Sequence, residues 1–126
     1  MQAHYIRLFA DADGESCFED VTVDLTRGDL LVRGADALAI APFLQSEGTF
    51  FAVTPPSWKG TALHPAPRRF IAITLEGEYE VTTSKGDTRR IAKGTVLIIE
   101  DTTGKGHSTS LLSGRVVSFC VALPDV

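Results

Sequence analysis

The strongest constraint on the fold is a regular spacing of glycines in the second half of the chain. The segments between these glycines are short and rich in Val, Ile, Thr and Phe. The glycines are Gly77, Gly86, Gly94, Gly104, Gly106 and Gly114. In the tetrapeptides "SKGD" and "AKGT" the glycine stands where a β-hairpin turn needs a positive φ. Short strands joined by tight turns predict an all-β fold, with the strands antiparallel in a sandwich or barrel.

Strand-like segments account for most of the chain. The predicted strands cover residues 18–25, 49–55, 69–75, 78–84, 88–92, 95–100, 107–112 and 115–123. Residues 38–44 are predicted as a loop or a single short turn, because Pro42 would break a longer helix. No segment has the pattern of an amphipathic helix of three turns, so we expect little helix.

Length and charge exclude several classes of protein. A chain of 126 residues predicts one domain, over residues 1–126. The net charge of −4 argues against nucleic acid as a partner, because phosphate binding needs a basic face. No apolar run is long enough to span a bilayer, and no signal peptide is visible. We therefore expect a cytoplasmic protein without a membrane partner.

The two cysteines, Cys17 and Cys120, do not make a disulfide scaffold in a chain of this size. Cys120 lies in "VVSFCVAL", which is typical of a buried strand. Free structural thiols are the favoured interpretation. A disulfide between them is the alternative, and a catalytic thiol is less favoured still.

Histidines are the first candidates for chemistry. His4 lies near an N-terminus that we expect to be mobile, and it is set aside. His64 and His107 each stand where a loop enters a predicted strand, so they can meet at one end of a barrel. Imidazole is a common metal ligand and a common general base. The alternative is two histidines in a polar pocket, hydrogen-bonded to hydroxyls such as those of Thr102, Thr103 or Thr109.

Two blocks of sequence make the chain resemble a small single-domain cupin. The first is "GTALHPAPRRFIAITLEGEYEV" and the second is "GTVLIIEDTTGKGHSTSLL". Gly77, Gly94, His64 and His107 match the cupin motifs. The resemblance implies an antiparallel double-stranded β-helix, or jelly-roll barrel, with N-terminal strands and loops in residues 1–57 and the two motif blocks in residues 58–123.

The same resemblance also implies a metal site and a dimer. Cupins that bind metal generally use three histidines and a glutamate, and here only His64 and His107 stand at those positions. Ala66 and Phe70 occupy the places of the second histidine and the glutamate. The cofactor implied is one divalent ion, of zinc, nickel, iron or manganese, held by His64 and His107. Cupins commonly form homodimers, and an outward apolar face with Ile71, Ile73 and Leu75 would need cover.

Strand alternation predicts what else lines the pocket. If Phe70 points inward, then Arg68, Ala72 and Thr74 share its side, and an inward His107 brings Thr109 and Leu111 with it. Trp58 caps the pocket mouth or else packs in the core or a dimer interface. Arg68 or Arg69 contacts a carboxylate of the ligand, or else both are solvated or paired with surface acids. The predicted ligand-binding residues are Trp58, His64, Arg68, Phe70, Thr74, His107 and Thr109.

Three functions stay open at this point. The first is binding of a small organic molecule, for which an anionic end is one option. The second is a metal-dependent enzyme of the dioxygenase, isomerase or lyase type, which the cupin resemblance implies through His64 and His107. The third is a metal-free enzyme with one of these histidines as general base. The fold cannot choose among them, because function depends on the site.

Overall fold

The computed structural model describes residues 1–28, 38–42, 44–60 and 62–125, and these residues form strands and loops without a helix. The strands are β1 (Gln2–Ala10), β2 (Ser16–Asp24), β3 (Thr26–Gly28), β4 (Leu38–Ile40), β5 (Thr49–Thr54), β6 (Phe70–Glu76), β7 (Tyr79–Thr82), β8 (Thr88–Ile91), β9 (Val96–Ile99), β10 (Ser108–Leu111) and β11 (Val116–Ala122). The prediction of an all-β fold is confirmed. None of the described residues belongs to a helix that could cross a membrane.

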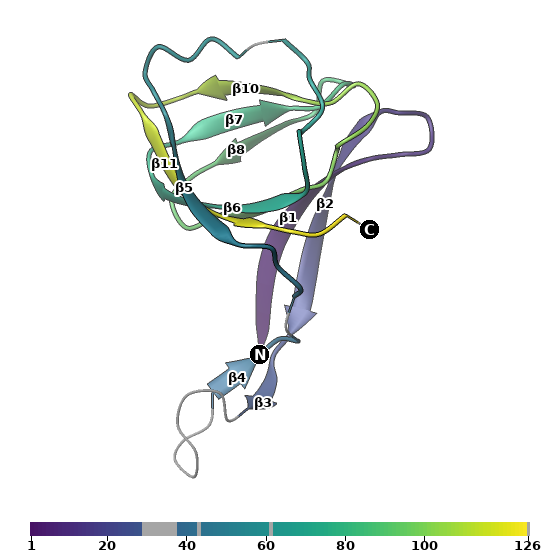
Figure 1. The fold of residues 1–126 in the computed structure, drawn as a ribbon, viewed down its shortest axis with the longest axis vertical. Coiled ribbons are helices and arrows are strands. Elements are labelled where there is room, and N and C mark those ends of the chain that lie inside the picture. The colour runs from purple at the N-terminus through teal and green to yellow at the C-terminus, as the bar shows by residue number, and fades with distance from the viewer. Residues whose placement is uncertain (29–37, 43, 61, 126) are drawn as a thin grey trace.

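Two sheets form the body of the molecule. A six-stranded sheet has the order β2-β1-β9-β6-β11-β5, and a three-stranded sheet has the order β10-β7-β8. Figure 1 shows the smaller sheet lying opposite β5, β6 and β11. The β1–β2 hairpin continues beyond this body, and the short β3–β4 ribbon lies at its far end (Figure 1).

The N-terminal strand corrects one prediction. Residues around His4 were expected to be mobile, but β1 pairs with β2 from Gln2 to Ala10 and lies parallel to β9 from Ile6 to Leu8. Leu8 explains the difference, because its side chain is fully buried between the sheets and such burial stabilises by roughly 1.5–3 kcal/mol. The loop or turn predicted at residues 38–44 is also wrong in part, since Leu38–Ile40 forms β4; Phe43 lies outside the described residues.

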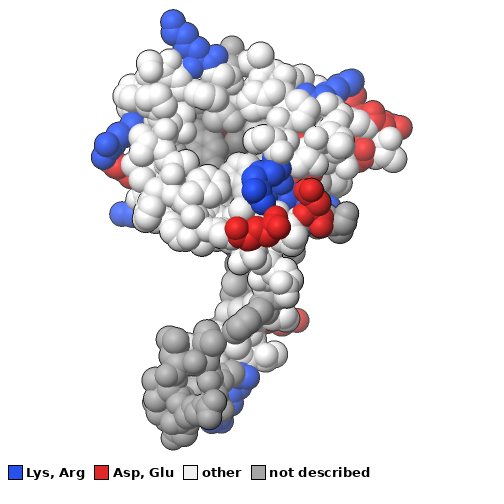
Figure 2. All heavy atoms as spheres, in the orientation of Figure 1, with Lys and Arg blue, Asp and Glu red and all other residues white. Residues whose placement is uncertain are grey.

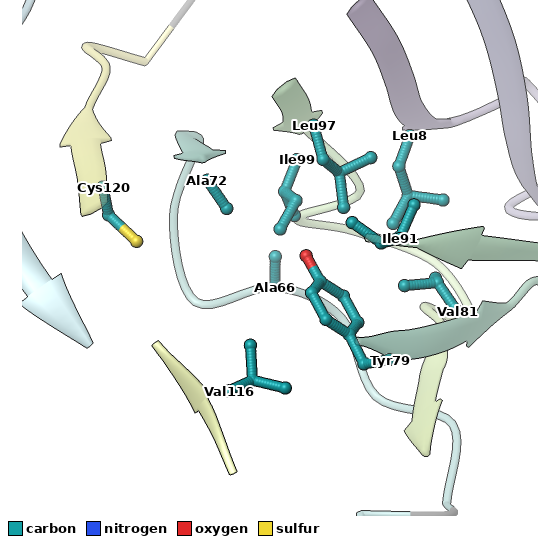
Figure 3. Close-up of a cluster of buried hydrophobic side chains, with 10 residues drawn as sticks. All are labelled: Leu8, Ala66, Ala72, Tyr79, Val81, Ile91, Leu97, Ile99, Val116 and Cys120. Carbon is teal, nitrogen blue, oxygen red and sulfur yellow. The ribbon is translucent and has the colours of Figure 1, made fainter. Parts of the chain in front are cut away.

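The core fills the space between the two sheets because alternate side chains of each strand point inward. In β11 every second residue is buried, from Val116 to Ala122. The buried cluster consists of Leu8, Ala66, Ala72, Tyr79, Val81, Ile91, Leu97, Ile99, Val116 and Cys120. Figure 3 shows Tyr79 reaching from the smaller sheet toward the larger one, with its hydroxyl toward Ile99 and Ala66.

The opposite face of the large sheet is apolar and less covered. Ile71 and Ile73 are half-buried there, and Leu75 is exposed. Phe51 of the edge strand β5 is 70% exposed and packs edge-on against Phe119 at 5.0 Å between ring centroids. The homodimer predicted to cover this face stays a prediction.

A candidate binding cavity with a buried Asp–His pair

A cavity of about 200 Å³ lies between the two sheets. The face seen in Figure 2 is hollowed between them. The cavity is lined by Ala52, Thr54, Trp58, Phe70, Ala72, Tyr79, Ile99, His107, Thr109, Val116, Ser118 and Cys120. The lining combines aromatic and aliphatic side chains with a few hydroxyls and one imidazole. Such a mixture suits a small organic ligand with one polar end.

The polar end of the cavity is formed by His107, which is paired with Asp101 outside the lining. Asp101 is 0% exposed and His107 is 6% exposed, and the Nδ1 atom of His107 lies 2.5 Å from Oδ2 of Asp101. The other carboxylate oxygen of Asp101, Oδ1, has no hydrogen-bond partner among the described residues. A buried carboxylate with one free oxygen is costly. Such a pair indicates that its position serves something other than stability.

His64 holds the backbone of His107 in place. The two residues form an antiparallel bridge, in which each N–H donates to the other carbonyl at 3.0 Å. Their rings meet edge to face, with 5.2 Å between centroids. His64 itself is exposed, and it does not belong to the residues that line the cavity. The two predicted histidines therefore lie together, but only His107 faces the cavity.

Glycines allow the loop before His107 to pack this closely. Gly106 has a φ of +75°, and a Cβ atom there would lie 2.0 Å from the backbone carbon of His64. The hydroxyl of Ser16 donates to the carbonyl of Gly106 at 2.8 Å. Ser84 in turn joins Ser16 through two backbone-to-hydroxyl bonds of 2.8 Å. The loop is thus fixed by the hairpin turns around it.

Trp58 closes one side of the cavity. Its Nε1–H donates to the carbonyl of Thr109 at 3.2 Å, and its ring lies against the backbone of Gly60, where a Cβ atom would be 2.2 Å from a ring carbon. The side chain is 41% exposed. Trp58 therefore separates part of the cavity from solvent, which fits the predicted position at the pocket mouth.

The other predicted ligand-binding residues divide into two groups. Phe70 and Thr109 line the cavity. Thr74 is buried but lies outside the lining. Arg68 also lies outside, because it precedes β6 and does not follow the alternation of that strand. Its guanidinium pairs with Glu47 at 2.9 Å.

The sequence interpretation missed Asp101 and Tyr79. Asp101 follows β9 and stands six residues before His107 in the sequence. A carboxylate next to a candidate histidine is a detectable signal, but the spacing alone does not show that the loop brings the two together. Burial raises the pKa of Tyr79 to about 12, so its hydroxyl stays protonated. Burial also raises the pKa of Cys120, and Cys17 and Cys120 are both free thiols.

The residues present do not fit a catalytic divalent ion. The ring separation of His64 and His107 allows two bonds of about 2.1 Å to one ion, and with Asp101 on Nδ1 it is Nε2 of His107 that would be the ligand. Within the described part of the chain, no group of three or more His, Cys, Asp or Glu side chains is arranged to hold a metal. A catalytic site normally needs three protein ligands.

The adjacent carboxylate, that of Glu100, lies outside the cavity and has two partners. Its two oxygens accept from Arg7 at 2.6 Å and from Arg69 at 2.7 Å. Burial alone would raise the pKa of Glu100, but the hydrogen bonds from the two guanidinium groups outweigh it and leave the pKa lowered. These arginines therefore serve a surface carboxylate and not a ligand in the cavity.

No protein-family model matches this chain, and no curated protein matches it.

Proposed function

We propose that the chain binds a small, uncharged organic molecule in the cavity between its two sheets. The observation that carries this proposal is the buried Asp101–His107 pair beside a lining that is otherwise neutral. A ligand with an apolar body would contact the aromatic and aliphatic side chains. Its polar end would reach His107.

The charge of the lining favours a neutral ligand over an anionic one. Among the described residues that line the cavity there is no Lys, Arg, Asp or Glu, and Cys120 and Tyr79 stay protonated because their pKa values are raised. An anion placed there would lose its hydration without gaining a cation. Arg68, the predicted contact for an anionic end, is paired with Glu47 outside the cavity.

We further propose that the two sheets represent a cupin-type double-stranded β-helix. Two opposed layers, antiparallel except for the parallel β1–β9 pair, with His64 and His107 bridged at one end, support this assignment. Phe70, at the place of the usual glutamate, lines the cavity as an aromatic contact. The binding proposed here involves no metal.

A cavity-filling variant tests the proposal. Toluene serves as the probe, and its binding is followed by NMR through the indole N–H of Trp58. We expect saturable binding with a Kd of about 1 mM, given the small number of atoms in the probe. Ala72→Leu should abolish it by filling the cavity, because Ala72 is part of the lining.

The matched control is Ile73→Leu, one residue along the same strand and on its other face. This variant should leave toluene binding unchanged. Binding that survives in Ala72→Leu, or shifts confined to the outer face of the large sheet, would contradict the proposal.

The metal-dependent alternative has its own test. Elemental analysis of the purified protein and of its His64→Ala variant distinguishes the two functions. A stoichiometric divalent ion that is lost in the variant would replace our proposal with a metal-dependent one. We expect far less than one metal ion per chain in both the wild-type protein and the His64→Ala variant.

A further inference from the structure

We propose that the ligand is a compact aromatic alcohol, of the phenol or benzyl alcohol class, whose hydroxyl donates a hydrogen bond to Nε2 of His107. This inference rests on the proposed function, because it names the chemical class that the same cavity would take. It follows from the proton on the imidazole and from the shape and chemistry of the lining.

The first step is the tautomer of His107. An ionised carboxylate can only accept hydrogen bonds. With the Asp101 carboxylate as the acceptor, the 2.5 Å contact between its Oδ2 and Nδ1 of His107 places the proton on Nδ1. The partner of one imidazole nitrogen decides the state of the other. A neutral His107 therefore has its lone pair on Nε2.

The second step is the need for a donor. Asp101 occupies Nδ1, so Nε2 is the ring nitrogen left for a ligand at this wall of the cavity. No hydrogen bond to Nε2 is present among the described residues. An unpaired nitrogen at the wall of an apolar cavity gains from a ligand that offers O–H or N–H, and it gains nothing from a carbonyl or an ether.

The third step is the body of the ligand. Three aromatic side chains line the cavity, those of Trp58, Phe70 and Tyr79. An apolar cavity of about 150 Å³ is known to accept benzene, and this one measures about 200 Å³. A benzene ring with one small substituent therefore fits. Aromatic walls favour a planar ring over an aliphatic chain of the same size.

The test compares probes that differ in hydrogen-bonding capacity. Phenol can donate, toluene has the same number of heavy atoms but no polar group, and benzaldehyde can only accept. Binding is measured by NMR titration at about pH 8, where an ordinary imidazole is neutral. We expect the wild-type chain to bind phenol at least about tenfold more tightly than either of the other two.

Two variants make the comparison specific. Asp101→Asn offers an amide N–H to Nδ1, which moves the proton to Nε2 and turns it into a donor. The preference should then change from phenol to benzaldehyde, with the tautomer followed by nitrogen NMR of His107. His107→Phe keeps a ring of similar size, and should remove the preference for phenol over toluene while toluene still binds.

Glu100→Gln is the control, because it alters the adjacent carboxylate outside the cavity and should leave the ratio of affinities unchanged. Equal binding of phenol and benzaldehyde by the wild type would overturn this inference but leave the proposed function intact. If the Asp101→Asn variant carries its proton on Nε2 and still prefers phenol, the inference is also overturned. If none of the three probes binds, the proposed function itself fails.

Discussion

Two adjacent carboxylates of this chain lie in contrasting surroundings. Glu100 is on the outer side of the large sheet, where Arg7 and Arg69 each pair with one of its oxygens. Asp101 is fully buried outside the cavity lining, where His107 is paired with one of its oxygens and the other oxygen has no partner among the described residues. The outer group has the charge compensation that stability requires. The inner group does not, which indicates that it is kept for the imidazole beside it.

The largest expected effect concerns the loop that holds the inner pair. Gly106→Ala would place a Cβ atom 2.0 Å from the backbone of His64, at a φ of +75°. We expect a loss of about 3 kcal/mol in the free energy of unfolding, measured with urea. The matched control is Gly86→Ala, at a φ of +92° but with no atom within 4 Å; it should cost about 1 kcal/mol. Equal losses of stability in the Gly106→Ala and Gly86→Ala variants would show that Gly106 does not pack closely against the backbone of His64.

The next largest loss of stability is expected for the outer cluster, which consists of Glu100 with Arg7 and Arg69. Glu100→Gln removes the charge that pairs with Arg7 and Arg69, on a side chain that is 14% exposed. We expect a loss of about 1–2 kcal/mol in urea unfolding, after allowing for solvent near the arginines. The comparison variant is Glu76→Gln, whose pair with Arg115 is more than half exposed on both sides, and it should cost less than about 0.5 kcal/mol. Equal losses would show that the pairs of Glu100 contribute no more to stability than the exposed pair of Glu76 with Arg115.

The pH dependence of stability tests the contribution of Glu100 in the outer cluster. The pKa of Glu100 is lowered from its ordinary value of 4.5 in the folded chain. Its contribution to stability is therefore complete above about pH 4.5 and is lost as the pH falls through the lower, folded pKa. Wild-type stability should decrease in this acidic range more steeply than that of Glu100→Gln, by up to about 1 kcal/mol in urea unfolding. Parallel curves would contradict the pairing.

The smallest effect is expected for the inner carboxylate. Asp101→Asn replaces a buried charge that has one unpartnered oxygen by a neutral amide. Since a buried and incompletely paired charge is itself costly, the change in unfolding free energy should be smaller than about 1 kcal/mol, and it can be a gain. A thermal or urea unfolding measurement decides this. A loss as large as that of Glu100→Gln would show that both carboxylates are structural.

The turns and the strands of the second half could be predicted from the sequence because both signals are local. Glycine at a turn and alternation along a strand each depend on neighbouring residues only, and Gly77, Gly86, Gly94, Gly104 and Gly106 all have positive φ. The first strand could not be predicted this way. It is stabilised by the burial of Leu8 and by pairing with β9, which is about ninety residues away in the chain.

The candidate site shows the same contrast between what local sequence predicts and what depends on contacts between distant residues. The matched positions of His64 and His107 predicted their proximity, and the structure bridges them. Arg68 could not be placed because alternation applies only within a strand, and β6 begins at Phe70. Asp101 could not be recognised because its pairing depends on the path of the loop up to His107.

We infer that Asp101 fixes the proton on Nδ1 of His107 and leaves Nε2 free to accept. Nitrogen NMR of the histidine rings at about pH 8 measures this directly, without any ligand. We predict that the His107 spectrum shows a protonated Nδ1 and an unprotonated Nε2. A proton on Nε2 of His107 in the wild-type chain would contradict the account.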